Sequence, residues 1–291
     1  GLELVSYLMA KSPLPILVLT GEVTRDDASL AFEAVRRGAL DLLPKPSARD
    51  DDALRALRAQ VRRLASVPVV RHLDARRHIE AATTAVRAAR APAPVVTVIE
   101  PIVVGIAASA GGPSALTAVL AGLPVDLPAA VAVVQHLPKG FASSFVSFLQ
   151  ARCALPVKLA EHGVVPRPGV VVVAPDDHHL EVIDGKLALT HGSPVEGHRP
   201  AGTVLLRSLA TLGSSAIGVV LSGIGRDGAE GLRAMRDRGG LTFAQDAASS
   251  VVYGMPRAAV EEGAAQEVLP ALELGEAITA AVLGARRKRW P

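Results

Sequence analysis

Cysteine, aromatic residues and long apolar runs are all scarce in this chain of 291 residues. The single cysteine, Cys153, excludes an internal disulfide and is typical of a protein from a reducing compartment. It falls in an apolar helical pattern, so we expect a packed and unreactive thiol. No apolar run approaches the ~20 residues that span a bilayer, and no signal peptide is visible. We therefore expect a cytoplasmic protein with no membrane insertion.

An excess of charge of one sign is also lacking, because 31 Lys and Arg residues nearly balance 28 Asp and Glu residues. The basic residues do not gather on a segment that carries aromatic side chains, so no nucleic-acid partner is expected. Hydrophobic residues make up 49% of the chain and aromatic residues 3%, which predicts a large core of Ala, Val and Leu. The chain begins at Gly1 inside a helical pattern, and we expect it to be a fragment of a longer protein.

The first two segments differ clearly in composition. Residues 1–46 alternate helical and apolar strand patterns, which predicts a small α/β unit. Residues 47–100 read as a helical linker rich in Arg, Ala and Pro, and its arginine face is typical of a solvated helix. The helices and strands of these segments are expected at 2–11, 15–21, 26–37, 40–43, 50–64 and 71–90, followed by a stiff Ala91-Pro92-Ala93-Pro94.

Residues 101–285 form the larger predicted domain. Apolar strands separated by helical stretches favour an α/β fold with a doubly wound, mostly parallel sheet. Alternation over 179–190 around Asp184-Gly185 predicts one antiparallel hairpin. The parallel strands are expected at 103–107, 130–134, 157–160, 170–174, 216–221 and 241–244.

The most informative stretch runs from Val103 to Gly112. An apolar run stops at small residues that include Ser109, and an apolar helical pattern follows at once. Small neighbours let another molecule approach the serine, and N–H groups at a helix start can stabilise an oxyanion. This turn suits a nucleophile or a phosphate site, and only other parts of the sequence can distinguish between the two.

Three side chains follow predicted strands at their carboxyl ends, where open parallel sheets place their sites. They are Ser109, His136 and Asp227, the parts of a nucleophilic triad. The histidine would take the serine proton, and the aspartate would orient the histidine. Each residue alone has a plainer interpretation as a turn residue, a packed histidine or a helix N-cap. Only the combination is specific.

Two other enzyme classes compete for the same residues. The turn from Gly105 to Gly111 loosely imitates a dinucleotide fingerprint, but Gln135-His136 stands where that fingerprint requires an acidic residue. An α/β-hydrolase would place its acid before its histidine, and here the order is Ser109, His136, Asp227. Both classes are therefore disfavoured.

A metal site is not expected. His178 and His179 are adjacent and would point to opposite faces of a strand, and Asp176-Asp177 can be explained as loop residues. The proposed chemistry requires no cofactor for catalysis.

Residues 101–270 resemble the chemotaxis-type protein-glutamate methylesterases, the CheB family. The resemblance places the catalytic serine, histidine and aspartate of that family on Ser109, His136 and Asp227. It also implies that the loop around Ile224 supplies an N–H to the oxyanion, beside the helix-start N–H groups near Ala110. The matching motifs are Ala108-Ser109-Ala110-Gly111-Gly112, Gln135-His136-Leu137-Pro138-Lys139-Gly140-Phe141, Ala174-Pro175-Asp176-Asp177-His178-His179, His198-Arg199-Pro200, Leu221 to Ala229, and Gln245-Asp246 through Arg257.

The resemblance implies hydrolysis of γ-glutamyl methyl esters on the cytoplasmic helices of chemoreceptors, with deamidation of receptor glutamines in many members. Three departures bear on rate and receptor choice. Ala110 replaces a usual threonine, Ala107 replaces a usual glycine, and Ala201-Gly202-Thr203 replaces a polar-acidic pattern. The alternative is a non-catalytic signalling module that keeps the fold and binds receptors.

Residues 1–46 resemble the second half of a response-regulator receiver domain, as in two-component signalling. Thr20 matches the switch threonine or serine of that domain, and Lys45 matches the lysine that contacts the phosphoryl group. The resemblance implies a histidine kinase partner for the full-length parent. The phospho-accepting aspartate belongs to the first half, so no phosphorylation site is expected in this chain. Half a sheet leaves an unpaired edge, and we expect this segment to be poorly stable alone.

Overall fold

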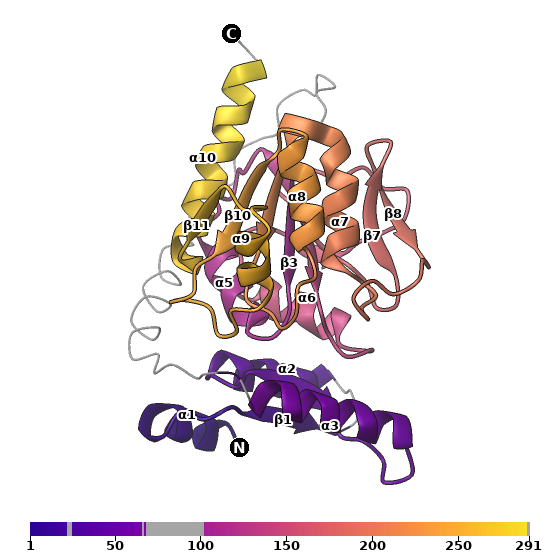
Figure 1. Cartoon of the computed structure of the whole chain (residues 1–291), viewed down its shortest axis with the longest axis vertical. Coiled ribbons are helices and arrows are strands. Elements are labelled where there is room, and N and C mark those ends of the chain that lie inside the picture. The colour runs from indigo at the N-terminus through magenta and orange to yellow at the C-terminus, as the bar shows by residue number, and fades with distance from the viewer. Residues whose placement is uncertain (22–24, 66, 68–101, 290–291) are drawn as a thin grey trace.

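The computed structural model describes residues 1–21, 25–65, 67 and 102–289 (Figure 1). The predicted helix over 71–90 and the proline-rich stretch after it lie outside the described residues. None of the helices in the described part combines the length and apolar character needed to cross a bilayer.

The N-terminal unit, residues 1–65, contains three helices and a two-stranded parallel sheet. Its helix and strand types match the prediction, with ends displaced by one or two residues. Strand β2 pairs along its whole length with β1, so the two strands end side by side. The elements are α1 (Leu2–Lys11), β1 (Leu17–Thr20), α2 (Arg25–Arg36), β2 (Asp41–Pro44) and α3 (Asp51–Ala65).

The larger domain is built on a seven-stranded parallel sheet in the order β11-β10-β9-β3-β4-β6-β5. All six predicted strands are present. The seventh, β11, was missed because it has only three residues and the first two of them, Glu267 and Val268, are exposed, so it lacks a buried apolar run. The strands are β3 (Ile102–Ala108), β4 (Ala129–Gln135), β5 (Val157–Leu159), β6 (Val171–Val173), β9 (Ala216–Val220), β10 (Leu241–Gln245) and β11 (Glu267–Leu269).

Helices cover both faces of this sheet (Figure 1), which confirms the doubly wound prediction. Every residue of β3 and β4 is buried, and alternate residues of β3 enter different apolar clusters. Helices α5 (Gly112–Ala121), α6 (Ala142–Gln150) and α10 (Ala271–Arg289) contribute to one cluster. Helices α7 (Gly202–Leu209), α8 (Ala229–Asp237) and α9 (Met255–Glu261) contribute to the other, with the 3-10 helix η1 (Ala210–Ser215) following α7.

The predicted hairpin is also confirmed. Strands β7 (His179–Ile183) and β8 (Lys186–Thr190) pair antiparallel. Asp184 and Gly185 both have positive φ, at 51° and 71°, as the tightest hairpin turns require. The hairpin packs against α7 and adds to the same apolar cluster.

The strand order reverses at β3. Strands β4, β6 and β5 lie on one side of it and β9, β10 and β11 on the other. Such a reversal opens a crevice at the carboxyl ends of the central strands. The fold therefore predicts a site where β3, β4 and β9 end.

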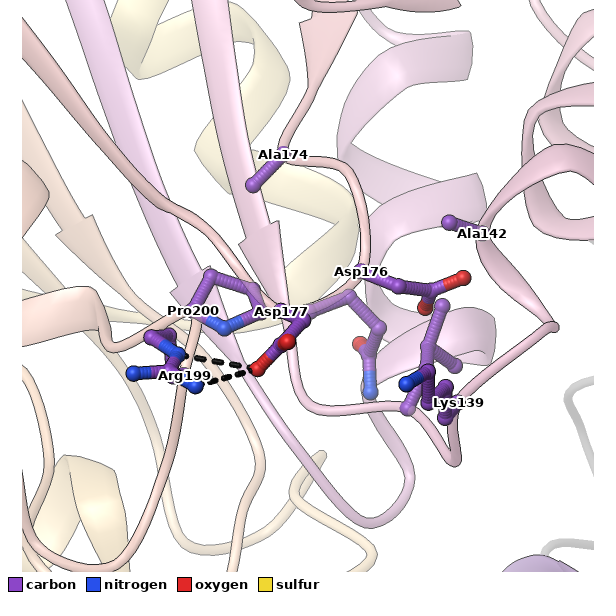
Figure 2. Close-up of a pocket in the computed structure, with 9 residues that line it drawn as sticks. Lys139, Ala142, Ala174, Asp176, Asp177, Arg199 and Pro200 are labelled. Carbon is purple, nitrogen blue, oxygen red and sulfur yellow. Dashed lines mark hydrogen bonds and ion pairs between the residues drawn. The ribbon is translucent and has the colours of Figure 1, made fainter. Parts of the chain in front are cut away.

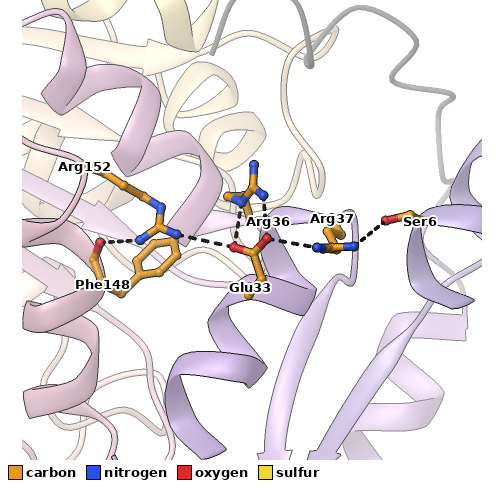
Figure 3. Close-up of polar contacts among 6 residues, drawn as sticks. All are labelled: Ser6, Glu33, Arg36, Arg37, Phe148 and Arg152. Carbon is orange, nitrogen blue, oxygen red and sulfur yellow. Dashed lines mark hydrogen bonds and ion pairs between the residues drawn. The ribbon is translucent and has the colours of Figure 1, made fainter. Parts of the chain in front are cut away.

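The N-terminal unit packs against α6 of the larger domain. The Phe32 ring lies 5.3 to 6.2 Å from the rings of Phe141, Phe145 and Phe148. Glu33 on α2 forms an ion pair with Arg152 at 3.4 Å, and the same arginine donates to the Phe148 carbonyl (Figure 3). Side chains on one helix thus hold the two parts of the chain together.

Cys153 differs from its prediction in one respect. It follows the end of α6 rather than lying within a helix, and it is half-buried against the core. Burial raises the pKa of its thiol, which fits the expected unreactive role.

Candidate active site at the carboxyl edge of the sheet

His136 and Asp227 meet at the end of the central strands. His136 follows β4, and Asp227 lies in the loop between β9 and α8. The His136 Nε2 atom is 2.7 Å from Asp227 Oδ2. Both side chains are almost fully buried, with 7% and 1% of their surfaces exposed. The expected convergence of these two residues is therefore observed.

The start of α7 holds the Asp227 carboxylate. The Gly202 N–H donates to Oδ2 at 2.6 Å, and the Thr203 N–H donates to Oδ1 at 2.8 Å. Burial alone would raise the pKa of Asp227, but the hydrogen bond and charge of His136, with these two N–H groups, lower it to about 2. The carboxylate stays ionised at neutral pH and can only accept hydrogen bonds.

This acceptor fixes the tautomer of His136. Since Asp227 is ionised, Nε2 carries the proton and Nδ1 is left as the basic nitrogen. The Nδ1 atom is buried and has no hydrogen-bond partner in the described part of the chain. The site therefore presents an oriented imidazole with a free lone pair.

A second imidazole covers the first. The rings of His136 and His198 stack with centroids 3.6 Å apart and planes at 13°. Burial and the neighbouring charge of His136 lower the pKa of His198 to about 4, against the opposing charge of Asp227. His198 is neutral at neutral pH. Its motif was recognised in the sequence, but no pattern indicated this stacking.

Ser109 occupies the turn between β3 and α5 and is half-buried. Its N–H donates to the Ser222 carbonyl at 3.0 Å, and its carbonyl accepts from Gln135 Nε2 at 2.8 Å. The hydroxyl forms no hydrogen bond with any described residue, His136 included. Catalytic hydrogen bonds are often long before substrate binds.

The turn after Ser109 is fixed on its other side by Ser222. The buried Ser222 hydroxyl donates to the Ala110 carbonyl at 2.8 Å and accepts from the Val252 N–H at 2.9 Å. Gly111 has φ of 75°, and a Cβ there would lie 2.6 Å from the Ser222 hydroxyl oxygen. Only glycine fits this position.

Two backbone N–H groups beside the serine have no partner among the described residues. One belongs to Ala110 and the other to Ile224, the two positions expected from the sequence to face the oxyanion. The Ile224 loop is held by Gly223, whose carbonyl accepts the N–H groups of Gly254 and Met255. Free N–H donors on a fixed backbone can stabilise an oxyanion.

The N-terminal unit reaches this turn. The Leu40 carbonyl accepts the Gly111 N–H at 3.1 Å. Burial raises the pKa of the neighbouring Asp41 to about 6, opposed by the Leu42 N–H, the Gln60 amide and the charge of His136. No sequence pattern indicated this proximity, because the contact joins separate units.

Thr20 and Lys45 lie at the ends of β1 and β2. The Lys45 N–H donates to the Thr20 carbonyl at 2.6 Å, so the two residues are neighbours. The Thr20 side chain is nearly buried and Lys45 is exposed.

A small open pocket of about 90 Å³ lies beside Gln135 (Figure 2). On one side of it, both Nε and Nη2 of Arg199 donate to Asp177 Oδ1, at 2.9 and 2.5 Å. On another side, Asp176 accepts the Gly140 N–H. No group of three or more His, Cys, Asp or Glu residues within the described ranges is arranged to hold a metal ion.

The comparisons with known proteins point to one family. The family model "CheB methylesterase" matches residues 104–278. The protein-glutamate methylesterase/protein-glutamine glutaminase 2 of Anaeromyxobacter dehalogenans is 45% identical over 96% of this chain and 78% of its own length. The protein-glutamate methylesterase FrzG of Myxococcus xanthus is 41% identical over 96% of this chain and 80% of its own length.

A solved structure matches as well. The crystal structure of the Thermotoga maritima CheB methylesterase catalytic domain superimposes with a TM-score of 0.60 at 37% identity, covering 62% of this chain and 99% of that domain. Because the family model matches residues 104–278 and these relatives are 37–45% identical over most of the matched lengths, the chain belongs to the CheB methylesterase family.

Proposed function

We propose that this chain hydrolyses methyl esters of glutamate side chains in proteins. The observation that carries the proposal is the buried His136–Asp227 pair, joined at 2.7 Å beside the Ser109 turn. An ionised acid, an oriented imidazole and an accessible hydroxyl are the groups that acyl transfer requires. The names of the relatives point to the same reaction.

In the first half of the reaction, the Ser109 oxygen attacks the ester carbonyl while His136 Nδ1 takes the hydroxyl proton. The resulting oxyanion accepts hydrogen bonds from the N–H groups of Ala110 and Ile224, which have no other partner in the described structure. The carbon–oxygen bond to the methoxy group then breaks. His136 gives its proton to the leaving oxygen, and methanol departs.

In the second half, His136 removes a proton from water, which attacks the acyl-serine. The same N–H groups hold the second oxyanion, and Ser109 leaves with the proton from His136. The products are a glutamate carboxylate and the regenerated hydroxyl. Asp227 stays ionised throughout and stabilises the imidazolium in each half. No cofactor enters this scheme.

A glutamine side-chain amide fits the same scheme, with ammonia as the leaving group. The relative in Anaeromyxobacter dehalogenans carries both activities in its name. We propose that the protein acts in the cytoplasm and that its substrates are the cytoplasmic helices of chemoreceptors, because the family serves chemotaxis. For the N-terminal unit we propose the second half of a receiver domain, with a histidine kinase as the partner of the parent protein. The adjacent ends of β1 and β2, with Thr20 and Lys45, support that proposal.

Methanol release from a methylated receptor fragment tests the proposal. The wild-type chain should release methanol, and Ser109→Ala should lose at least ~10³-fold in rate. A matched control is Ser147→Ala, since Ser147 lies on α6 and only donates to its own helix. No release by the wild-type chain would favour the alternative, a receptor-binding module without activity. Equal release by Ser109→Ala would remove Ser109 from the mechanism.

A further inference from the structure

The Gln135 side chain connects the backbones of two residues in the proposed mechanism. Its amide Nε2 donates to the Ser109 carbonyl at 2.8 Å and to the His136 carbonyl at 3.0 Å. A glutamine amide has two N–H donors, and both are used here. The side chain is 4% exposed, so water competes little for these bonds.

The glutamine at this position supplies two hydrogen bonds but also carries an energetic cost. Its Oε1 atom is buried without a hydrogen-bond partner in the described residues. A buried acceptor without a partner lowers the free energy of unfolding, and methionine has nearly the same shape without that acceptor. The two donors are the feature that methionine would not supply.

The absence of a side chain at Gly112 leaves the space that the Gln135 amide occupies. A Cβ at Gly112 would lie 2.1 Å from Gln135 Oε1 and 2.9 Å from the Ala108 Cβ. The backbone of Gly112 has no positive φ that would itself require glycine. The need for a glycine here therefore follows from the space that the Gln135 amide, the closer of the two neighbours, and the Ala108 Cβ occupy.

We propose that Gln135 is a positioning residue, which fixes the separation of the Ser109 hydroxyl and the His136 ring through their main chains. The β3–β4 ladder ends at Ala108 and Gln135, and the His136 N–H donates to the Ala108 carbonyl. Beyond that last rung, the Gln135 amide is the link between the two strands. The inference rests on the proposed function, because it concerns the same serine and histidine.

Gln135→Met tests this role, since it keeps the volume and removes both donors. The turnover number should fall roughly 10- to 100-fold with KM within about twofold, because displacing reacting groups by ~1 Å costs up to ~10²-fold. The melting temperature should change little, because the loss of the unpaired Oε1 offsets the loss of the donor to the His136 carbonyl, while the Ser109 carbonyl keeps the Gly112 N–H. Gln266→Met is the matched control. The Gln266 side chain accepts the Thr242 N–H at the amino end of β10, which is the end of the sheet away from the site. This variant should leave the turnover number unchanged.

Gly112→Ala is the second variant, because it displaces the amide and leaves Gln135 in place. It should show the same loss of turnover with unchanged KM. In Gln135→Ala/Gly112→Ala the shorter side chain removes the closer contact, at Oε1, and leaves the one at the Ala108 Cβ, so the losses of the two single variants should be less than additive. Additive losses would overturn the proposal.

A serine-directed fluorophosphonate separates this inference from the proposed function. It reports the reactivity of Ser109 without any receptor substrate. Wild-type labelling with slower labelling of Gln135→Met supports the inference even if no methanol is released from receptors. Equal labelling rates in folded wild-type and Gln135→Met protein overturn it, whatever the outcome of the methanol assay.

Discussion

His136 and Asp227 are 91 residues apart in the chain and 2.7 Å apart in the structure. The fold achieves this because β4 and β9 flank β3 and end at the same edge. Two N–H groups from the start of α7 donate hydrogen bonds to the Asp227 carboxylate. Three separate segments must be in place before the imidazole is oriented.

Replacing Asp227 with asparagine should reduce the turnover number by roughly 10⁴-fold, because a neutral amide no longer fixes the productive tautomer. An amide nitrogen would also face the donors of Gly202 or Thr203. The measurement is the single-turnover rate of ester hydrolysis, with circular dichroism to establish folding. A folded variant with a loss below about tenfold would contradict the proposed orienting role.

The same substitution should change how stability depends on pH. The pKa of Asp227 is lowered to about 2, so its ionised form stabilises the fold above the unfolded-state pKa of about 3.9. That contribution, about 3 kcal/mol, should disappear as pH falls from about 4 to about 2. Urea unfolding of wild type and Asp227→Asn across this range measures it. A difference in unfolding free energy that stays constant with pH would rule out this linkage.

Gly223→Ala should damage the site without touching a polar group. A Cβ there would lie 2.8 Å from the Ser109 Cβ and 2.1 Å from the Met255 sulfur. Backbone bonds to Val252 and Gly254 prevent Gly223 from retreating, so Ser109 must shift. We expect a loss of about 10²-fold in turnover, measured on the ester. Gly284→Ala, with no atom within 4 Å of its added Cβ, is the control and should keep full activity.

The sequence predicted the parts of this site whose signal is local. Strand ends could be located from apolar runs, and parallel topology placed Ser109, His136 and Asp227 at one edge. The Ser222 hydroxyl could not be assigned this way, because its acceptor is a backbone atom 112 residues away. The Gln135 amide, with an acceptor 26 residues away, was missed for the same reason. Such roles depend on tertiary distances that no periodicity encodes.

Thr203→Val should reduce stability through one unpaired donor. The Thr203 hydroxyl accepts the Gly228 N–H at 2.7 Å in a site that is 3% exposed. Valine keeps the shape but leaves that N–H buried and unpaired, which costs about 1–3 kcal/mol. Chemical denaturation measures the change. Thr117→Val is the control, because that hydroxyl only donates to a carbonyl within its own helix. Equal losses of unfolding free energy in the two variants would show that the hydrogen bond from the Gly228 N–H does not contribute the expected stability.

Phe32→Ala should release the N-terminal unit from the larger domain. The ring packs against three phenylalanines at the start and along α6, and it is fully buried. Its loss should weaken docking by about 3–5 kcal/mol. A two-stranded sheet is marginal on its own, so the detached unit should unfold locally. Limited proteolysis should then cleave residues 30–65 faster, while the melting of the larger domain stays unchanged.

Leu30→Ala is the control for this prediction. It truncates a side chain on the same helix that is 55% exposed, and it should leave the cleavage rate as in wild type. Equal protection of both variants would mean that the ion pair of Glu33 with Arg152 and the Leu40–Gly111 bond suffice to hold the unit in place.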